Sequence, residues 1–123
     1  EAPVTVEADE QLVRQALFNL VLNAIQAATE GGEIRIVATE GPANEATIEI
    51  RDNGPGVLPE HRTEIFKPYF TTQLKGTGLG LAVVQQIVRA HGWEIECVPN
   101  DPKGAIFRIR GMRVTSKNPD HAS

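Results

Sequence analysis

Cysteine, methionine and long apolar runs are scarce in this chain of 123 residues. The single cysteine, Cys97, excludes an internal disulfide framework and a cysteine-rich zinc site. No apolar run reaches the ~20 residues that cross a bilayer. The formal net charge of -4 disfavours nucleic acid as the main partner, because duplex-binding proteins carry a basic surface.

The remaining composition is that of an ordinary globular domain, with 41% hydrophobic and 23% charged residues. A chain of this length folds as one domain and buries about two-thirds of the surface of its unfolded form. It begins at Glu1, and its only methionine is Met112. We therefore expect a piece of a longer protein.

Apolar spacing predicts a first helix that begins after Asp9, its N-cap, and stops at Gly31-Gly32, and a second over about Leu79 to His91. Alternation predicts five strands, over residues 4–7, 34–38, 46–50, 93–98 and 105–109. Residues 52–80 lack a period except for a short helix near 59–66, and so long a loop is usually functional.

This order of elements predicts an α+β fold, a two-layer α/β sandwich in which helices cover one face of a mixed, mainly antiparallel sheet. We expect one domain over residues 1–110 and a polar C-terminal tail over residues 111–123.

Two asparagines, Asn19 and Asn23, are four residues apart on the first predicted helix and so share one face. Asparagine is a poor residue for a helix interior, so the pair needs a reason. One interpretation is a pair of amide oxygens for a hard cation such as Mg²⁺. The other is a polar strip that hydrogen-bonds to a neighbouring loop.

The segment Asp52-Asn53-Gly54-Pro55-Gly56 follows a predicted strand and can be a plain turn. Its aspartate is also placed to accept a hydrogen bond from the exocyclic amino group of adenine. Guanine has a carbonyl oxygen where adenine has this amino group. Two hydrogen-bond acceptors would then face each other, which lowers the affinity for guanine. The two glycines lack a Cβ and let the backbone approach a base.

The segment Gly76-Thr77-Gly78-Leu79-Gly80 opens the second predicted helix. Alternate glycines there turn successive N–H groups toward an anion, and the alternative is a flexible hinge. The segment is not a Walker loop, because Gly-Lys-Ser/Thr is missing. It is not a dinucleotide fingerprint either, because a long loop precedes it.

The loop before this segment carries Phe66, Tyr69 and Phe70, followed by Thr71-Thr72. Aromatic residues in such a loop either anchor a lid over a ligand or seal the edge of the core.

In this order the four motifs strongly resemble the catalytic, ATP-binding domain of bacterial sensor histidine kinases, within the superfamily shared with DNA gyrase, MutL and heat-shock chaperones. Asn-Leu-Val-Leu-Asn-Ala resembles the asparagine box and Asp-Asn-Gly-Pro-Gly the first glycine box. Phe-Lys-Pro-Tyr-Phe resembles the phenylalanine box and Gly-Thr-Gly-Leu-Gly-Leu the second glycine box. The resemblance spans about residues 9–109 and is strongest to nitrogen-regulation-type kinases. It implies a Bergerat-type ATP-binding fold.

The resemblance also implies roles. Asn23, with Asn19, would ligate the Mg²⁺ that bridges the phosphates of ATP, and Asp52 would hold the adenine amino group. Residues 57–75 would form the ATP lid, and such lids gate chemistry. The implied nucleotide-binding set is Asn19, Asn23, Asp52, Gly54, Gly56, Phe66, Phe70, Thr71, Thr72, Lys75, Gly76, Thr77, Gly78, Leu79 and Gly80.

Two positions depart from the family pattern. Many relatives have lysine directly after the Thr-Thr pair, but Gln73 stands there, so we expect Lys75 to meet the γ-phosphate. Members that hydrolyse ATP carry a glutamate base four residues before the magnesium asparagine, where this chain has Asn19. Without a carboxylate to activate water, phosphoryl transfer is favoured over hydrolysis. Asn19 and Lys75 are therefore the expected catalytic residues.

None of His61, His91 and His121 lies early in a long helix beside an acidic residue, as the family's phosphoacceptor does. We expect the acceptor on a separate helical dimerisation domain of the parent protein, with a response regulator downstream. We further expect a homodimeric parent, a monomeric isolated domain and a cytoplasmic location, whether or not the parent is anchored in a membrane. The alternative functions are a nucleotide-sensing interaction module without catalysis and an anti-sigma-type serine kinase.

Overall fold

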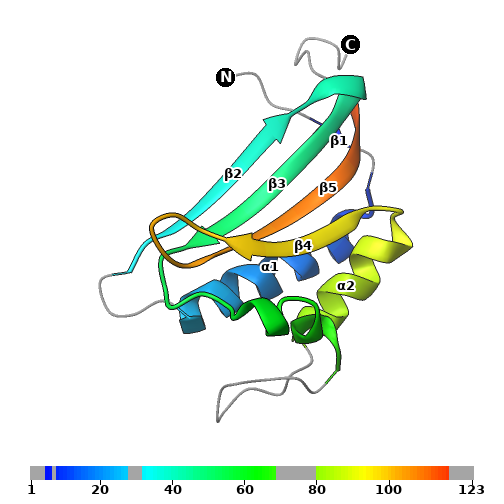
Figure 1. The fold of residues 1–123 in the computed structure, drawn as a ribbon. Coiled ribbons are helices and arrows are strands. Elements are labelled where there is room, and N and C mark those ends of the chain that lie inside the picture. Colours follow the sequence, from blue (N-terminus) through cyan, green and yellow to red (C-terminus); the bar gives the residue numbers. More distant parts are fainter. Residues whose placement is uncertain (1–4, 7, 28–31, 69–79, 117–123) are drawn as a thin grey trace.

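The computed structural model describes residues 5–6, 8–27, 32–68 and 80–116. Two helices and five strands follow in the predicted order (Figure 1). They are β1 (Thr5–Val6), α1 (Glu10–Ala27), β2 (Ile34–Glu40), β3 (Glu45–Asp52), α2 (Gly80–Ala90), β4 (Glu94–Pro99) and β5 (Ala105–Ser116). Three short 3₁₀ helices add to these: η1 (Pro42–Asn44), η2 (Pro59–His61) and η3 (Glu64–Phe66).

The strands form one sheet in which β2 pairs with β3, β3 with β5, and β5 with both β4 and β1. All four pairings are antiparallel, whereas a mixed sheet was expected. Strand β5 also runs past the predicted end at Ile109 to Ser116, so residues 111–116 belong to the sheet and not to a polar tail. The first part of β5 pairs with β4, and Val114–Ser116 pair with β1.

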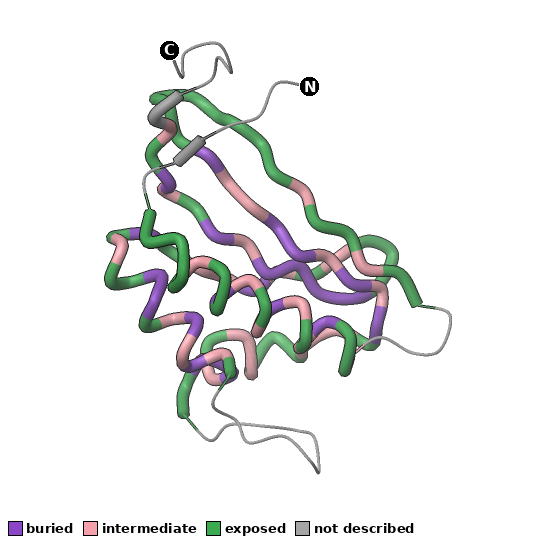
Figure 2. Tube along the Cα trace, turned by 180° about the vertical axis from the view of Figure 1, so that it is seen from behind, coloured by how far each residue is buried: buried purple, intermediate pink, exposed green. Residues whose placement is uncertain are grey.

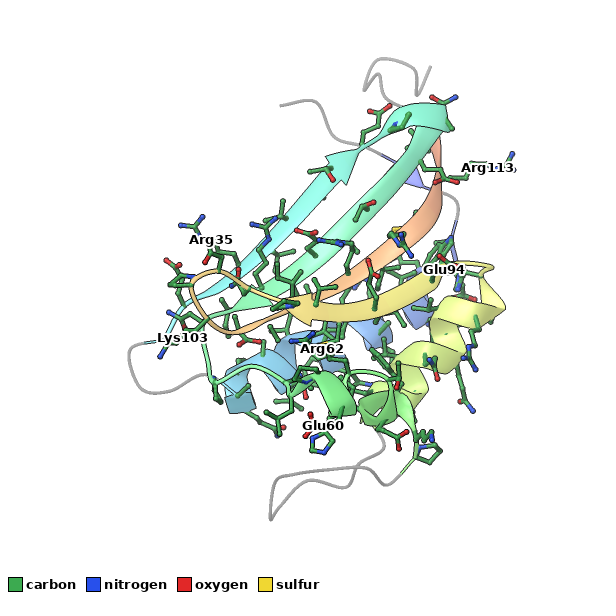
Figure 3. The ribbon with its side chains drawn as sticks, in the orientation of Figure 1. Arg35, Glu60, Arg62, Glu94, Lys103 and Arg113 are labelled. Carbon is green, nitrogen blue, oxygen red and sulfur yellow. The ribbon has the colours of Figure 1, made fainter. Side chains whose placement is uncertain are left out.

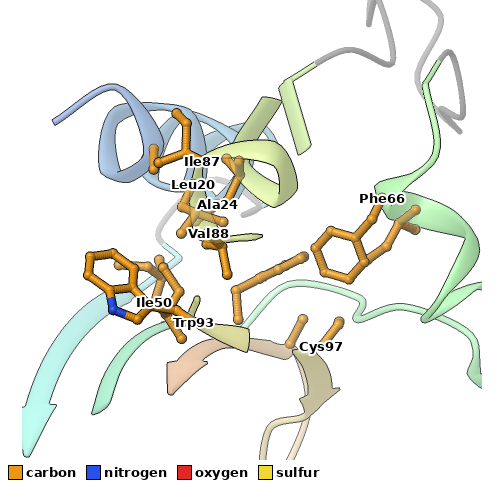
Figure 4. Packing of buried hydrophobic residues seen from close by; sticks show 14 of the residues in the cluster. Leu20, Ala24, Ile50, Phe66, Ile87, Val88, Trp93 and Cys97 are labelled. Atoms are coloured by element: carbon orange, nitrogen blue, oxygen red, sulfur yellow. The ribbon is translucent and has the colours of Figure 1, made fainter. Parts of the chain in front are cut away.

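Helices α1 and α2 cover one face of the sheet, as the two-layer sandwich predicts (Figure 1). Buried side chains from both helices meet those of β3, β4 and β5 between the layers (Figures 2 and 4). Leu20, Val84 and Val88 come from the helices, and Ile50 and Phe107 from the sheet. None of the helices in the described ranges is long and apolar enough to cross a membrane.

Helix α1 begins as its sequence predicts. The carboxylate Oδ1 of Asp9 accepts a hydrogen bond from the Leu12 backbone N–H at 3.1 Å, which satisfies a donor of the first turn. Ala16, Leu20 and Ala24 then recur every four residues and are buried, so one face of α1 lies on the core.

His91 links the start of α1 to the end of α2. Its Nε2 accepts a hydrogen bond from the Asp9 backbone N–H at 3.0 Å. Its Nδ1 therefore carries the proton and donates to the Ile87 carbonyl at 2.8 Å. The ring also stacks on Trp93, with centroids 4.2 Å apart. His91 thus has a structural role.

The opposite face of the sheet carries a ladder of alternating charges. Arg108 contacts Glu49 at 2.6 Å and Glu96 at 3.0 Å, and Arg51 also pairs with Glu49. Burial alone would raise the pKa of Glu49, but hydrogen bonds from Arg108 and Arg51 outweigh it and hold that pKa below its ordinary value. The ladder joins β3, β5 and β4 on the face that the helices leave uncovered.

Candidate nucleotide-binding site

Asp52, the last residue of β3, is almost fully buried, with 2% of its surface exposed. Its Oδ1 accepts a hydrogen bond from the Gly54 backbone N–H at 2.9 Å. Its main-chain carbonyl accepts one from Asn100 Nδ2 at 2.8 Å. Within the described residues, no donor meets the second carboxylate oxygen, Oδ2. The side chain is therefore held in place with one acceptor left for a ligand.

The turn after Asp52 is tied to the segment before β2. The Asn53 side chain accepts a hydrogen bond from the Glu33 N–H at 2.9 Å, and the Asn53 N–H donates to the Glu33 carbonyl at 3.3 Å. These two bonds fix the backbone of the Asp-Asn-Gly turn, so Asp52 lies on a rigid support.

Close packing explains three glycines around this turn. A Cβ on Gly54 would lie 2.5 Å from the Ala27 carbonyl oxygen at the end of α1. Gly56 has φ +84°, and a Cβ there would meet the Gly104 carbonyl. Gly104 has φ +110°, and its Cβ would collide with the Asp52 carbonyl. The predicted closeness of Gly54 and Gly56 to a base stays a prediction, but each already has a structural reason.

Sequence reasoning missed Asn100 and Gly104, both of which support Asp52. They lie in the connection between β4 and β5, outside the strands predicted over residues 93–98 and 105–109. The signal was the Asn-Asp-Pro-Lys-Gly composition of that turn. Composition does not say that the turn folds back on the end of β3.

Asn19 and Asn23 lie half-buried on the side of α1 that includes the contact with α2. Asn19 Nδ2 is 3.4 Å from the carbonyl of Gly80, the first residue of α2, and donates to it. Its amide nitrogen is therefore engaged and its Oδ1 is left as an acceptor. Asn23 makes no side-chain hydrogen bond within the described part of the chain. Both asparagines thus keep an acceptor oxygen on one side of α1.

These groups line one side of the C-terminal half of α1. Gly54 packs on Ala27 at its C-terminal end, while Asn19 lies beside Gly80 about 12 Å back along the helix axis. We call the line from Asp52 past Asn23 and Asn19 to Gly80 the α1 strip. The buried Asp52 carboxylate lies at one end of it, Asn23 lies along it, and Asn19 with the first residue of α2 lies at the other end.

The α1 strip could supply some of the ligands of a divalent cation, and the phosphates of a bound nucleotide would supply others. Across the described residues, no three His, Cys, Asp or Glu side chains cluster in a way that would bind a metal alone. Mg²⁺ takes oxygen ligands and is commonly bound by one or two protein groups plus substrate phosphates. The amide oxygens of Asn19, beside the start of α2, and of Asn23, one turn further along α1, could form such a partial ligand set.

Phe66, midway along the predicted lid, seals the core. Its ring is buried and meets that of Phe107 edge-on, with centroids 6.1 Å apart (Figure 4). This is the core-sealing role of the two that the sequence left open for the aromatic segment. The predicted site residues Phe70, Thr71, Thr72, Lys75, Gly76, Thr77, Gly78 and Leu79 lie outside the described residues.

Arg62 and Cys97 lie near the strip without joining it. Arg62 lies beneath β4 (Figure 3), and its buried Nε has no hydrogen-bond partner among the described residues. Burial raises the pKa of the Cys97 thiol to about 11, so the thiol stays protonated at neutral pH. Thiolate chemistry is therefore excluded at this site.

A separate hollow of about 370 Å³ lies between α2 and the start of β4. Its lining residues are Gln85, Val88, Arg89, Trp93, Glu94, Ile95 and Arg110. It shares no residue with the α1 strip, so the strip and the hollow are distinct places on the molecule.

The antiparallel sheet, the buried aspartate at a strand end and the paired asparagines beside a helix start define a nucleotide-binding domain of the Bergerat type. Residues 8–114 match the family described as histidine kinase-, DNA gyrase B-, and HSP90-like ATPase. The chain belongs to this family, as its four motifs predict.

The sensor histidine kinase ZraS of Salmonella typhimurium is 44% identical over 104 residues, which are 85% of this chain and 22% of ZraS. The chain thus spans less than a quarter of that relative. The mycobacterial sensor histidine kinase MprB superposes with a TM-score of 0.85 at 29% identity, covering 93% of this chain and 79% of MprB. Full-length ShkA, solved in complex with AMPPNP, superposes with a TM-score of 0.81 at 30% identity. The match covers 94% of this chain and 25% of ShkA. The resemblance to sensor histidine kinases and the predicted fold class are confirmed.

Proposed function

We propose that this chain binds Mg-ATP along the α1 strip and transfers the γ-phosphoryl group to a histidine on a separate helical domain of its parent protein. The observation that carries the proposal is the strip itself, in a chain whose relatives are sensor histidine kinases. The response regulator is the proposed downstream partner, as expected for a two-component sensor kinase.

At the base end, Asp52 Oδ2, which meets no donor among the described residues, accepts a hydrogen bond from the exocyclic amino group of adenine. The Gly54 N–H and the Asn100 side chain hold the aspartate in place, so little ordering is needed on binding. The AMPPNP in the ShkA structure supports ATP as the nucleotide. Guanine would present a carbonyl to the carboxylate and be rejected.

At the phosphate end, the first N–H groups of α2 point along the helix axis toward an anion. Asn19 and Asn23 would hold Mg²⁺, which neutralises phosphate charge. Gly76, Gly78 and Lys75 remain the proposed further phosphate contacts. Asn19 has no carboxylate and cannot take a proton from water, which favours transfer to a partner over hydrolysis.

The acceptor is proposed to lie outside this chain. Both ring nitrogens of His91 are engaged in the structure, so it is not poised as a nucleophile. In the transfer, an imidazole nitrogen of the acceptor forms a bond to the γ-phosphorus while the bond to the β–γ bridging oxygen breaks. ADP leaves with that electron pair, and the imidazole loses a proton.

The test is transfer of label from γ-³²P-ATP, with magnesium, to the helical histidine-containing domain of the parent added in trans. We expect label on the acceptor histidine, and little release of inorganic phosphate when the acceptor is absent. An absence of transfer with intact ATP binding would instead favour the interaction module. Transfer to a serine of a bound transcription factor would favour the anti-sigma type.

The metal assignment is tested by Asn23→Ala. We expect the variant to keep its fold and to lose the magnesium-dependent part of its ATP affinity in calorimetry. Gln26→Ala, on the same helix but exposed, is the matched control. Equal magnesium dependence in the variant and the control would contradict the assignment.

A further inference from the structure

The outer face of α1 carries large apolar side chains that the fold does not use. Phe18, Leu22 and Ile25 are 66%, 40% and 55% exposed. Their i, i+4, i+7 spacing puts them in one row, opposite the buried row of Ala16, Leu20 and Ala24. We call Phe18, Leu22 and Ile25 the outer stripe.

Single exposed apolar residues are normal on a protein surface, but a continuous row on one helix marks an interaction surface. A helix that is apolar on opposite faces is typical of a buried helix, not of one that faces water. The outer stripe adds little to the stability of this domain, because its side chains stay in solvent.

The surroundings of the outer stripe are nearly free of net charge. Gln11, Gln15 and Gln26 are the exposed polar neighbours. Among the described residues of α1, the one cation close by, Arg14, is paired with Glu10 at 2.7 Å. A charged or nucleic-acid partner has little to bind here, whereas the apolar ridge of another helix packs well on such a row.

We propose that the outer stripe docks the apolar face of a helix in the phosphoacceptor domain of the parent protein. This inference rests on the proposed function and names its docking surface. Asn19 is next to Phe18, about 100° around the helix. A helix on the stripe therefore lies alongside the proposed phosphate end of the α1 strip, where the acceptor histidine must arrive.

A contact of three large side chains is weak on its own, and a tether within the parent protein raises its occupancy. The chain spans 22% of the length of ZraS, which leaves ample sequence in a comparable parent for such a domain. Within one polypeptide the effective concentration reaches about millimolar for a short flexible linker. A weak apolar contact therefore docks the helix and still releases it after transfer.

The test compares the wild-type chain with a triple variant, Phe18→Gln, Leu22→Gln and Ile25→Gln. Glutamine is a good helix former, so α1 is kept. The matched control is Ile36→Gln, because Ile36 is 59% exposed but lies on β2. Binding of each protein to the fluorescently labelled acceptor domain is titrated by anisotropy, and ATP binding is measured separately by calorimetry.

We expect the triple variant to bind the acceptor domain about tenfold more weakly or worse, while ATP affinity and acceptor binding by the control stay unchanged. Equal acceptor binding by all three proteins would overturn the docking surface. A wild-type chain that dimerises through the stripe, with a monomeric triple variant in light scattering, would also overturn it. Stripe-dependent binding without phosphoryl transfer would leave the docking surface standing and refute the proposed function.

Discussion

At the scale of single residues, Asp52 shows how the fold can hold one carboxylate of a short polar motif in a fixed position. One carboxylate oxygen is used by the turn that follows, and the other is free within the described residues. Its neighbours Asn100 and Gly104 come from a turn about fifty residues later in the chain and fix the backbone around it. The position of the carboxylate therefore depends on that support, and so does the base recognition that we propose for it.

Asp52→Asn tests the recognition of the base. An amide can present a donor where adenine requires an acceptor, and a hydrogen bond to a charged group contributes about 1.5–3 kcal/mol. We expect ATP affinity to fall about tenfold to a hundredfold in calorimetry. The control Asp101→Asn changes an exposed aspartate of the β4–β5 turn. Equal ATP affinities of the two variants would show that Asp52 does not hold the base.

Gly104→Ala tests the support of Asp52. With φ +110° and no room for a Cβ beside the Asp52 carbonyl, the substitution strains the turn, and we expect unfolding to cost about 2 kcal/mol less. In the control, Gly80→Ala, the new Cβ meets nothing within 4 Å, and stability should hold or rise. Urea denaturation followed by circular dichroism measures both. A Gly104 variant as stable as the wild type would contradict the packing.

At the scale of elements, the two helices are locked together by His91 as well as by their apolar faces. His91→Ala removes the acceptor for the Asp9 N–H, the donor to Ile87 and the stack on Trp93. We expect a loss of about 1–3 kcal/mol in the free energy of unfolding, with amide exchange fastest at the first turn of α1. Arg89→Ala, an exposed change near the end of the same helix, is the control and should be near neutral. An unchanged unfolding midpoint for His91→Ala would show that His91 does not stabilise the contact between the two helices.

The charge ladder makes the sheet sensitive to acid. The pKa of Glu49 is lower in the folded chain than its ordinary value of 4.5, so its stabilising effect is complete above that value. The effect is lost as pH falls through the folded pKa. Glu49→Gln should therefore lose less stability than the wild type between neutral pH and about pH 3. Urea denaturation at a series of pH values measures this. The prediction is contradicted if the free energy of unfolding falls equally with pH in the wild type and in the variant.

At the scale of the whole molecule, local sequence patterns are enough to predict most elements of the fold. The spacing of Leu20 and Ala24 and the N-cap at Asp9 specify α1, and alternation specifies β2 and β3. The end of β5 was missed because Gly111, at φ +92°, interrupts the alternation on which strand prediction relies. Long-range pairing, not local pattern, extends that strand to Ser116.

Part of the candidate site was visible in the sequence. Asp52 and the two asparagines could be proposed because the chemistry of each residue type is visible there. Asn100 and Gly104 could not, because contacts across about fifty residues leave no periodic signal. The α1 strip itself, which runs from a buried carboxylate past two amides to the start of α2, emerges only when β3, α1 and α2 come together in space.

The most direct measurement of the central claim is a crystal structure of this chain with magnesium and AMPPNP. We predict the adenine amino group within hydrogen-bond distance of Asp52, the metal on Asn23 and the triphosphate at the start of α2. A nucleotide bound elsewhere, for example in the hollow beside Trp93, with Asp52 and Asn23 untouched, would contradict the account.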